Sequence, residues 1–195
     1  KLSEIIIPIS GIDMTSEVLR LKKEDPDYVI MNAYIGNSSA ILRTAKKFNF
    51  RKPFFVTQYG AVKTTVELAK DSAENFFGLN CFGLYNDKTP GMTSLRKAKQ
   101  KFDPGSGYQD TNFTQGWFVG IVMSKGMKNA GKNLNGETLV KGVNKINNFN
   151  TKGICGIINF NSNDHKAIDY SRIFKTDIKN KVLIPITDWR KPNDI

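Results

Sequence analysis

The sequence predicts an α/β fold in which strands and helices alternate around a doubly wound, mostly parallel sheet. Four short apolar runs begin near Ile5, Tyr28, Phe54 and Phe76, so that a run recurs every 22 to 26 residues. Each interval between two runs contains apolar residues at the spacing of a helix. Because the runs are almost continuously apolar, they are typical of parallel strands that helices cover on both faces.

The first two intervals also contain residues that begin and end helices. In the first interval Asp13 or Thr15 can cap a helix, and Pro26 ends it before the next apolar run. In the second interval Ser38 or Ser39 can cap a helix whose apolar residues recur at the helical period. Both intervals are therefore expected to be helical connections between parallel strands.

The pattern changes after the stretch NCFGLY. Residues 86–111 are rich in Gly, Pro, Asp and Lys around a short helix at 93–102. Two helices follow, one from Phe113 to near Gly131 and one after Gly136, and neither is followed by a parallel strand of its own. We expect these helices to cover a sheet that is supplied elsewhere.

The last forty residues return to strands. The stretch GIINF, residues 156–160, is expected to be one strand. The stretches RIFKTDI and VLIPITDW are joined by a short polar turn, residues 179–181, and predict a β-hairpin.

Composition excludes several classes of partner. The chain has 29 Lys and Arg and a formal net charge of +11, but no block of five or more basic residues. We interpret the positive charge as a solvated surface and expect no nucleic-acid partner. No run approaches the ~20 apolar residues of a membrane-spanning helix. Two cysteines and a single histidine exclude a zinc site, and no metal ligand set is expected.

Residues for catalysis are also missing. The sequence contains no Gly-rich phosphate loop and no nucleophile-elbow motif. His165 lies in the polar stretch NSNDHKA, where a solvated or capping role is the simpler interpretation. Asp13 could resemble the acidic residue of a phosphoacceptor domain, but a helix cap is the simpler assignment. We therefore expect no enzyme and no cofactor.

Polar and aromatic residues instead follow two of the apolar runs. Tyr34 and Asn37 follow DYVIMNA, and Gln58 and Tyr59 follow FFV. In open α/β sheets ligands bind at the carboxyl ends of strands, where helix N-termini present free backbone groups. These four residues are the candidate ligand site, although Tyr34 and Tyr59 could equally fill loops.

Six segments in order carry a resemblance to a known family. They are IDMTSEVLRLKKEDPDYVIMNAY, AILRTAKKFNFRKPFFVTQYG, DSAENFFG, FTQGWFVGIVMSKGMKNAG, GICGIINFNSNDH and IFKTDIKNKVLIPITDW. In this order the chain resembles the solute-binding proteins of branched-chain-amino-acid-type ABC transporters, which have the type I periplasmic binding protein fold. That fold has two α/β lobes joined by three crossover strands, with the solute bound between the lobes.

The resemblance implies a division of the chain. Residues 1–83 and 162–195 would belong to the second lobe, and residues 84–161 would return to the first lobe, whose β core would precede Lys1. NCFGLY and CGIINF would be two of the crossovers. They would run close together, so the resemblance also suggests a disulfide between Cys81 and Cys155.

The resemblance implies a ligand role for the strand ends. Leucine-type members have an aromatic residue at the position of Tyr34, which is kept here, and a carboxylate at the position of Gln58, which pairs with the ligand ammonium. A neutral Gln58 removes that charge-assisted bond. We therefore expect a solute without a free α-ammonium, such as an aromatic or aliphatic carboxylate or an amide, in contact with Tyr34, Tyr59, Gln58 and Asn37.

The implied activity is capture of a small solute, either amino acid-like or an aromatic or aliphatic carboxylate or amide, and its delivery to the membrane subunits of an importer. The same fold also serves as a ligand-sensing domain of receptors and regulators, which is the alternative. The expected location is periplasmic or extracellular, with a signal peptide or a lipid anchor on a preceding segment.

Overall fold

The chain forms two compact units, each described here by itself. The computed structural model describes residues 3–9 and 11–192. Unit 1 comprises Lys1–Asn80 and Ile173–Thr187, and unit 2 comprises Cys81–Arg172 and Asp188–Ile195. The chain therefore passes between the units at three places. Residues 81–83, 162–172 and 188–192 group with unit 2, so the division differs there from the expected lobes, and the assignment of lobes stays a prediction.

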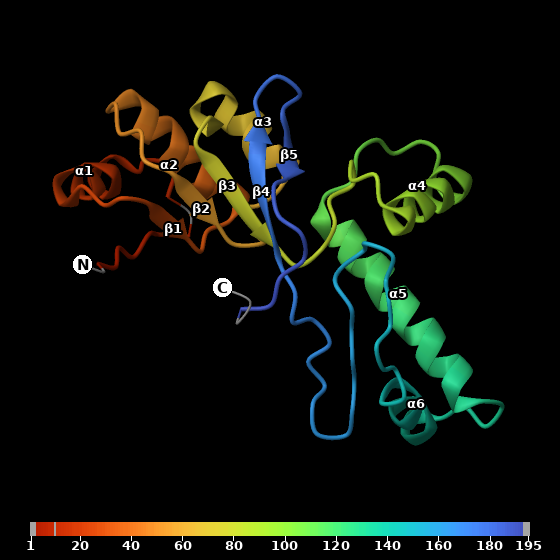
Figure 1. Ribbon diagram of the computed structural model, residues 1–195. Helices are drawn as coiled ribbons and strands as arrows, with labels where there is room; N and C mark the ends of the chain where they lie inside the picture. Colours follow the sequence, from red (N-terminus) through yellow and green to blue (C-terminus); the bar gives the residue numbers. More distant parts are fainter. Residues whose placement is uncertain (1–2, 10, 193–195) are drawn as a thin grey trace. The chain divides into compact units, whose positions relative to one another are not determined.

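Unit 1 is built on a mixed five-stranded sheet with the strand order β1-β2-β3-β4-β5 (Figure 1). β1 pairs with β2, and β2 with β3, in parallel, while β4 and β5 form an antiparallel hairpin. The α/β class and the hairpin are confirmed. The bounds are β1 Val29–Met31, β2 Phe54–Val56, β3 Phe76–Asn80, β4 Arg172–Asp177 and β5 Val182–Pro185.

Helices connect the parallel strands of unit 1, as the apolar spacing predicts. α2 packs against both α3 and α1. α2 begins earlier than expected, because Tyr34 is its N-cap and Ser38 and Ser39 are buried inside the helix. The bounds are α1 Thr15–Glu24, α2 Ile35–Lys47 and α3 Lys63–Ala69, followed by the 3-10 helix η1 Lys70–Ala73.

The sheet of unit 1 is fully buried on one face only. Val29, Phe54 and Phe76 lie side by side in the parallel register and are buried. The next row, which alternation of side chains places on the opposite face, is Ile30, Phe55 and Phe77. Ile30 is 69% exposed, and the Phe55 and Phe77 rings stack at 4.8 Å. Within the described residues, the expected cover of this second face is not present.

The first apolar run does not form a strand. Residues 3–9 have no regular structure, and Ile6 and Ile9 are 87% and 83% exposed. Pro8 has no N–H to donate to a sheet, and its carbonyl instead accepts from the N–H of Gly11 at 3.1 Å. The expected strand at this run is therefore wrong, because its backbone is used in a local turn.

Unit 2 consists of helices and irregular segments. Thr89 caps α4, with Pro90 at its first position, and Asn135 and Thr138 form a capping box at the start of α6. The expected strand at 156–160 is wrong, because Ile158 makes only an isolated bridge to Phe149. The helices are α4 Pro90–Phe102, α5 Thr111–Ala130 and α6 Gly136–Val143.

The core of unit 2 lies between its helices and the irregular segments. Two glycines let α5 and α6 approach closely, because a Cβ on Gly142 would lie 2.3 Å from the carbonyl oxygen of Gly126. The buried cluster consists of Phe82, Met92, Leu95, Phe118, Val122, Ile146, Ile154, Cys155 and Ile158.

The two faces of the sheet predict different costs for neighbouring substitutions. Phe76→Ala should lower the free energy of unfolding by about 3–5 kcal/mol, because Phe76 is completely buried. Phe77→Ala is the matched control on the half-buried face, and should cost only about 1–2 kcal/mol. Urea denaturation measures both values. Equal losses would contradict the assignment of the faces.

Candidate functional site

Two loops at the carboxyl ends of β1 and β2 bring a pair of tyrosines together. The rings of Tyr34 and Tyr59 lie 5.6 Å apart between centroids, at an interplanar angle of 48°. Each tyrosine is 57% exposed. Both rings therefore keep more than half of their surface in solvent while they contact each other. They offer an apolar surface with hydroxyl groups for a ligand.

Backbone pairing between the strands sets the positions of the two loops. The N–H of Thr57 donates to the carbonyl of Met31 at 3.0 Å, which extends the ladder one residue beyond β2. The Thr57 hydroxyl then donates to Oδ1 of Asn32 at 2.8 Å. The ends of β1 and β2 are therefore joined by a backbone and a side-chain hydrogen bond just before the tyrosines.

Gly60 allows the second loop to lie against the first. A Cβ at this position would lie 2.6 Å from Oγ of Ser38 and 2.8 Å from the carbonyl oxygen of Ala33. Both distances are shorter than a normal contact. Only glycine therefore permits this close approach, and the approach places Tyr59 beside Tyr34.

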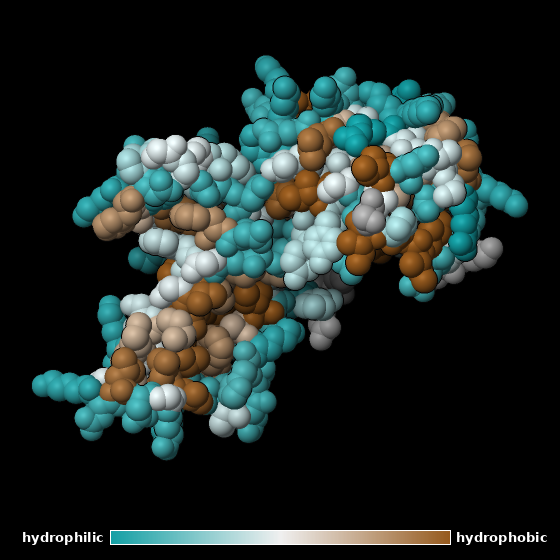
Figure 2. Space-filling view, turned by 180° about the vertical axis from the view of Figure 1, so that it is seen from behind, coloured by the Kyte–Doolittle hydropathy of each residue, from teal (hydrophilic) through white to brown (hydrophobic). Residues whose placement is uncertain are grey.

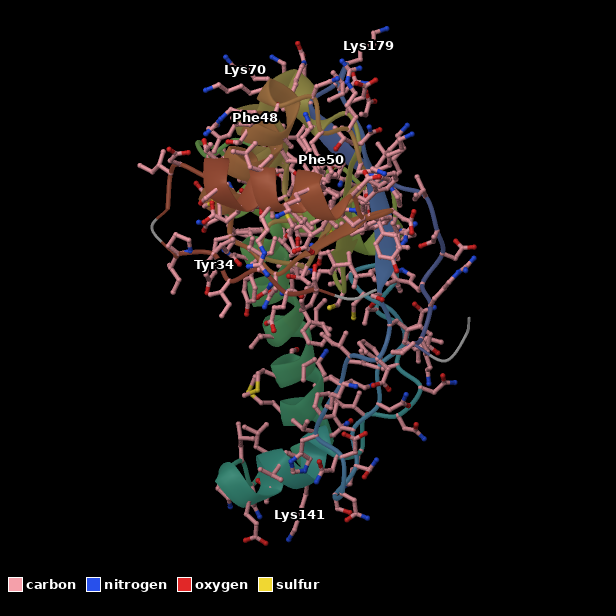
Figure 3. All side chains as sticks on the ribbon, turned by 90° about the vertical axis from the view of Figure 1, so that its left-hand side faces the viewer. Tyr34, Phe48, Phe50, Lys70, Lys141 and Lys179 are labelled. Atoms are coloured by element: carbon pink, nitrogen blue, oxygen red, sulfur yellow. The ribbon has the colours of Figure 1, made fainter. Side chains whose placement is uncertain are left out.

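Tyr34 also begins α2, so the tyrosine pair lies next to a helix N-terminus. The N–H of Ser38 donates to the Tyr34 carbonyl at 2.9 Å, while the N–H groups of the first turn have no partner inside the helix. Such groups favour a negative or carbonyl oxygen of a ligand. Figure 3 shows Tyr34 at the opposite end of unit 1 from Phe48, Lys70 and Lys179.

The other two predicted ligand residues have different surroundings. Gln58 is half-buried and lies between Thr57 and Tyr59 in the same loop. Asn37 is buried, and its amide nitrogen donates to the carbonyl of Pro8 at 3.0 Å and that of Gly11 at 3.4 Å. The structure thus brings Tyr34, Gln58 and Tyr59 to the two loops, whereas the Asn37 amide binds the carbonyls of Pro8 and Gly11.

The two loops carry no charged side chain. Residues 32–37 read NAYIGN and residues 57–62 read TQYGAV, in a chain with a net charge of +11. Asn32 and Thr57 were not among the predicted site residues, although their position directly after the strands was a usable signal. The site is therefore a neutral one, built from hydroxyl, amide and aromatic groups.

The remaining candidate groups belong to unit 2. Gly83 N–H donates to the Ile154 carbonyl at 2.7 Å, so the segments of Cys81 and Cys155 run side by side within unit 2. Both cysteines are thiols in the structure. Burial and, to a lesser extent, Cys81 raise the pKa of Cys155 to about 11, against a hydrogen bond from Thr151. Cys155 is therefore a poor nucleophile at neutral pH, and its pairing with Cys81 stays a prediction.

No other cluster in the described residues suggests chemistry. His165 is exposed in its loop. Across residues 3–9 and 11–192, His, Cys, Asp and Glu do not gather in threes at any place that could hold a metal ion. None of the helices in this part of the chain is both long enough and apolar enough to cross a bilayer.

The fold is an α/β domain whose parallel strands β1 and β2 are followed by loops with exposed tyrosine rings, and open α/β sheets bind ligands at such strand ends. The family model of the periplasmic binding proteins matches residues 2–181. The chain therefore belongs to the periplasmic binding proteins. This is a family of binding proteins, and the expectation that the chain is not an enzyme is confirmed.

Solved structures of similar fold come from ABC transporters. A branched-chain amino acid ABC transporter protein from Thermus thermophilus with bound valine has 20% identity and a TM-score of 0.83, over 94% of this chain and 51% of that one. A fatty acid ABC transporter substrate-binding protein from Thermomonospora curvata has 20% identity and a TM-score of 0.82, over 94% and 48%.

A leucine-binding protein from Thermotoga maritima has 18% identity and a TM-score of 0.76, over 95% of this chain and 51% of that one. At these identities the likeness shows the fold alone. The chain thus spans about half the length of these solved structures. No curated protein sequence matches the chain.

The close approach at Gly60 predicts a loss of stability when a side chain is added there. Gly60→Ala should lower the free energy of unfolding by about 1–3 kcal/mol, because the new Cβ would overlap with Oγ of Ser38 and the carbonyl oxygen of Ala33. Gly36→Ala is the matched control, since a Cβ on Gly36 meets nothing within 4 Å. It should be neutral or up to about 1 kcal/mol stabilising. Urea denaturation compares the two variants, and an unaffected Gly60→Ala protein would contradict the packing of the loops.

Proposed function

We propose that the chain is part of the substrate-binding component of an ABC importer and contacts a small solute through Tyr34, Tyr59 and Gln58. The observation that carries this proposal is the exposed tyrosine pair at the ends of β1 and β2, in a member of the periplasmic binding proteins. In such proteins two lobes close on the solute, and the closed form is presented to the membrane subunits. Asn37 supports the site through hydrogen bonds from its amide to the carbonyls of Pro8 and Gly11.

The chemistry of the loops favours a solute without a free α-ammonium. A buried ammonium needs a carboxylate partner, and residues 32–37 and 57–62 supply none. Gln58, the Tyr34 and Tyr59 hydroxyls and the first turn of α2 offer donors that suit a carboxylate or an amide carbonyl. Of the two solute classes named for the similar structures, amino acids and fatty acids, only fatty acids lack the ammonium.

A charge at position 58 should therefore change the class of solute. The measurement is a thermal-shift screen of the longer protein that contains this chain, with leucine, valine, octanoate, phenylacetate and its amide. The carboxylates or the amide should raise the melting temperature of the unmodified protein. Gln58→Glu should abolish that shift and make leucine stabilising, because the introduced carboxylate pairs with the ammonium.

The matched control is Gln100→Glu, which adds the same charge at an exposed position of α4. This control should leave every shift unchanged. Strong stabilisation of the unmodified protein by leucine would contradict the proposed role of Gln58, while leaving solute binding itself supported. No shift with any solute would contradict the proposed site.

The similar structures contain a further half that this chain does not span. We also propose that a segment equivalent to that half packs against two apolar surfaces of the chain. One is the half-open face of the unit 1 sheet, with the row Ile30, Phe55 and Phe77. The other is a groove of about 850 Å³ along α5 in unit 2, where Figure 2 shows a hydrophobic surface. Its apolar lining consists of Phe113, Trp117, Ile121 and Phe149.

Both surfaces leave large apolar side chains partly in solvent. The α5 groove supports the assignment of residues 84–161 to a first lobe whose sheet lies elsewhere. The half-open sheet face supports the proposal that the equivalent segment also packs against unit 1.

A charge on the sheet face should reveal that cover. Ile30→Lys should change the stability of the 195-residue chain by no more than about 0.5 kcal/mol, because Ile30 is 69% exposed there. In the longer protein it should cost at least about 2 kcal/mol, since the Lys would be buried. Leu19→Lys on α1, which is 45% exposed, is the control and should cost the same in both proteins. An equal, small effect of Ile30→Lys in both would show that the face stays in solvent.

The alternative function is a ligand-sensing domain of a receptor or regulator with the same fold. Its supporting observation is the same tyrosine pair, since both functions need a bound solute. A periplasmic or extracellular location, a signal peptide or lipid anchor, and binding to transporter membrane subunits are parts of the importer proposal alone. Co-purification of the longer protein with transporter membrane subunits would favour import.

A further inference from the structure

A buried ion pair in unit 2 lies beside the places where the chain passes to unit 1. The carboxylate of Asp87, whose side chain is 2% exposed, has its Oδ2 atom 3.6 Å from a guanidinium nitrogen of Arg172, which is 13% exposed. The Arg172 guanidinium in turn lies over the ring of Trp189, 5.1 Å from its centroid. These three residues form the Asp87 cluster, and all three belong to unit 2.

Local hydrogen bonds fix the Asp87 side of the cluster. The N–H of Asp87 donates to the Leu84 carbonyl at 2.9 Å, and the Leu84 N–H donates to Oδ2 of Asp87 at 3.2 Å. The guanidinium of Arg96 on α4 donates to the carbonyls of Tyr85 and Asp87. The segment after β3 is therefore held on the rigid frame of α4.

Backbone pairing joins the other two members. Ser171 and Arg190 exchange two backbone hydrogen bonds of 2.9 Å each, so Arg172 and Trp189 are neighbours of a paired position. Trp189 also packs against the buried cluster of unit 2. Arg172 thus lies next to the paired residues Ser171 and Arg190 in the backbone, and its side chain reaches Asp87.

Each member lies on a different connection between the units. The chain leaves unit 1 after Asn80, returns to it after Arg172, and leaves it again after Thr187. Asp87 follows the first passage, Arg172 precedes the second, and Trp189 follows the third. The Asp87 cluster therefore ties all three connections together on the unit 2 side.

Stability alone does not explain a carboxylate at this place. Burial raises the pKa of Asp87, and Arg172 and Arg96 offset this only in part. A pKa above its unfolded value means that the ionised form lowers the stability of the fold at neutral pH. That cost is lost as the pH falls through the folded-state pKa. In addition, Oδ1 of Asp87 is buried without a hydrogen-bond partner among the described residues.

We infer that Asp87 is a positioning residue that, through Arg172, holds the three connections in one rigid block, so that motion between the units is confined to the residues beyond this block. With the block intact, closure on a solute is a single movement. Without it, the connections move independently, the open state gains conformations, and the closed state is less populated. The consequence for solute affinity rests on the proposed function, whereas the clamping of the connections does not.

Hydrogen exchange tests, without any solute, whether Asp87 holds the three connections together. Asp87→Asn should speed exchange of the Ser171 and Arg190 amides by about tenfold or more, and leave the amides of α5 unchanged. The melting temperature is measured in parallel, because the substitution also takes the Asp87 carboxylate away from the mostly buried Arg172 guanidinium. Arg172→Lys, which keeps the charge but loses the planar contact with Trp189, should give a smaller increase in exchange.

The matched control is Asp169→Asn, which removes the exposed ion pair of Asp169 with Lys166 at 3.1 Å in the same unit. It should leave the Ser171 and Arg190 amides unchanged. Unchanged exchange in the Asp87→Asn protein would overturn the inference. A lower melting temperature with faster exchange throughout unit 2 would also overturn it, since Asp87 would then be a structural residue only.

Solute affinity of the longer protein tests the consequence for closure. The dissociation constant for octanoate should rise by about three- to tenfold in the Asp87→Asn protein, with the Asp169→Asn protein unchanged. Equal affinities in all three proteins would overturn the link to closure. If octanoate does not bind the unmodified protein, it is excluded as a ligand, and the exchange measurement still decides whether Asp87 holds the connections.

Discussion

The parallel register of β1 and β2 is the constraint on which the candidate site depends. Met31 lies opposite Val56, and the ladder continues through the hydrogen bond from Thr57 to Met31. Because both strands end at the same level, the residues that follow them meet at one edge of the sheet. A shift by one residue would turn the buried rows outward, and it would separate Tyr34 from Tyr59.

The same register divides the sheet of unit 1 into a buried and a half-open face. The buried row supplies the apolar contacts that hold the strands, while the opposite row keeps large side chains in solvent. In unit 2, α5 likewise has an apolar groove along one side. Both observations agree with a chain that spans about half the length of its solved relatives. The positive charge of the chain lies elsewhere, since residues 32–37 and 57–62 carry no charged side chain.

Much of the fold could be predicted from local patterns. The three parallel strands, the helices between them and the final hairpin all follow from apolar spacing and turn residues. The two wrong strands, at residues 5–9 and 156–160, are as apolar as the correct ones. A strand exists only where a partner accepts its hydrogen bonds, and apolar spacing contains no information on partners. Helix starts were imprecise for a related reason, since α2 is capped by backbone geometry at Tyr34 without a capping side chain.

For the site, the sequence by itself determined that uncharged polar and aromatic residues follow two adjacent strands. It determined this because strand ends are marked by local composition. Only the tertiary structure decided that Tyr34 and Tyr59 form a pair, that the Asn37 amide holds a loop, and that Asp87 reaches Arg172. Each of these depends on contacts between segments far apart in the chain. Such contacts are set by packing of the whole unit, and no local pattern specifies them.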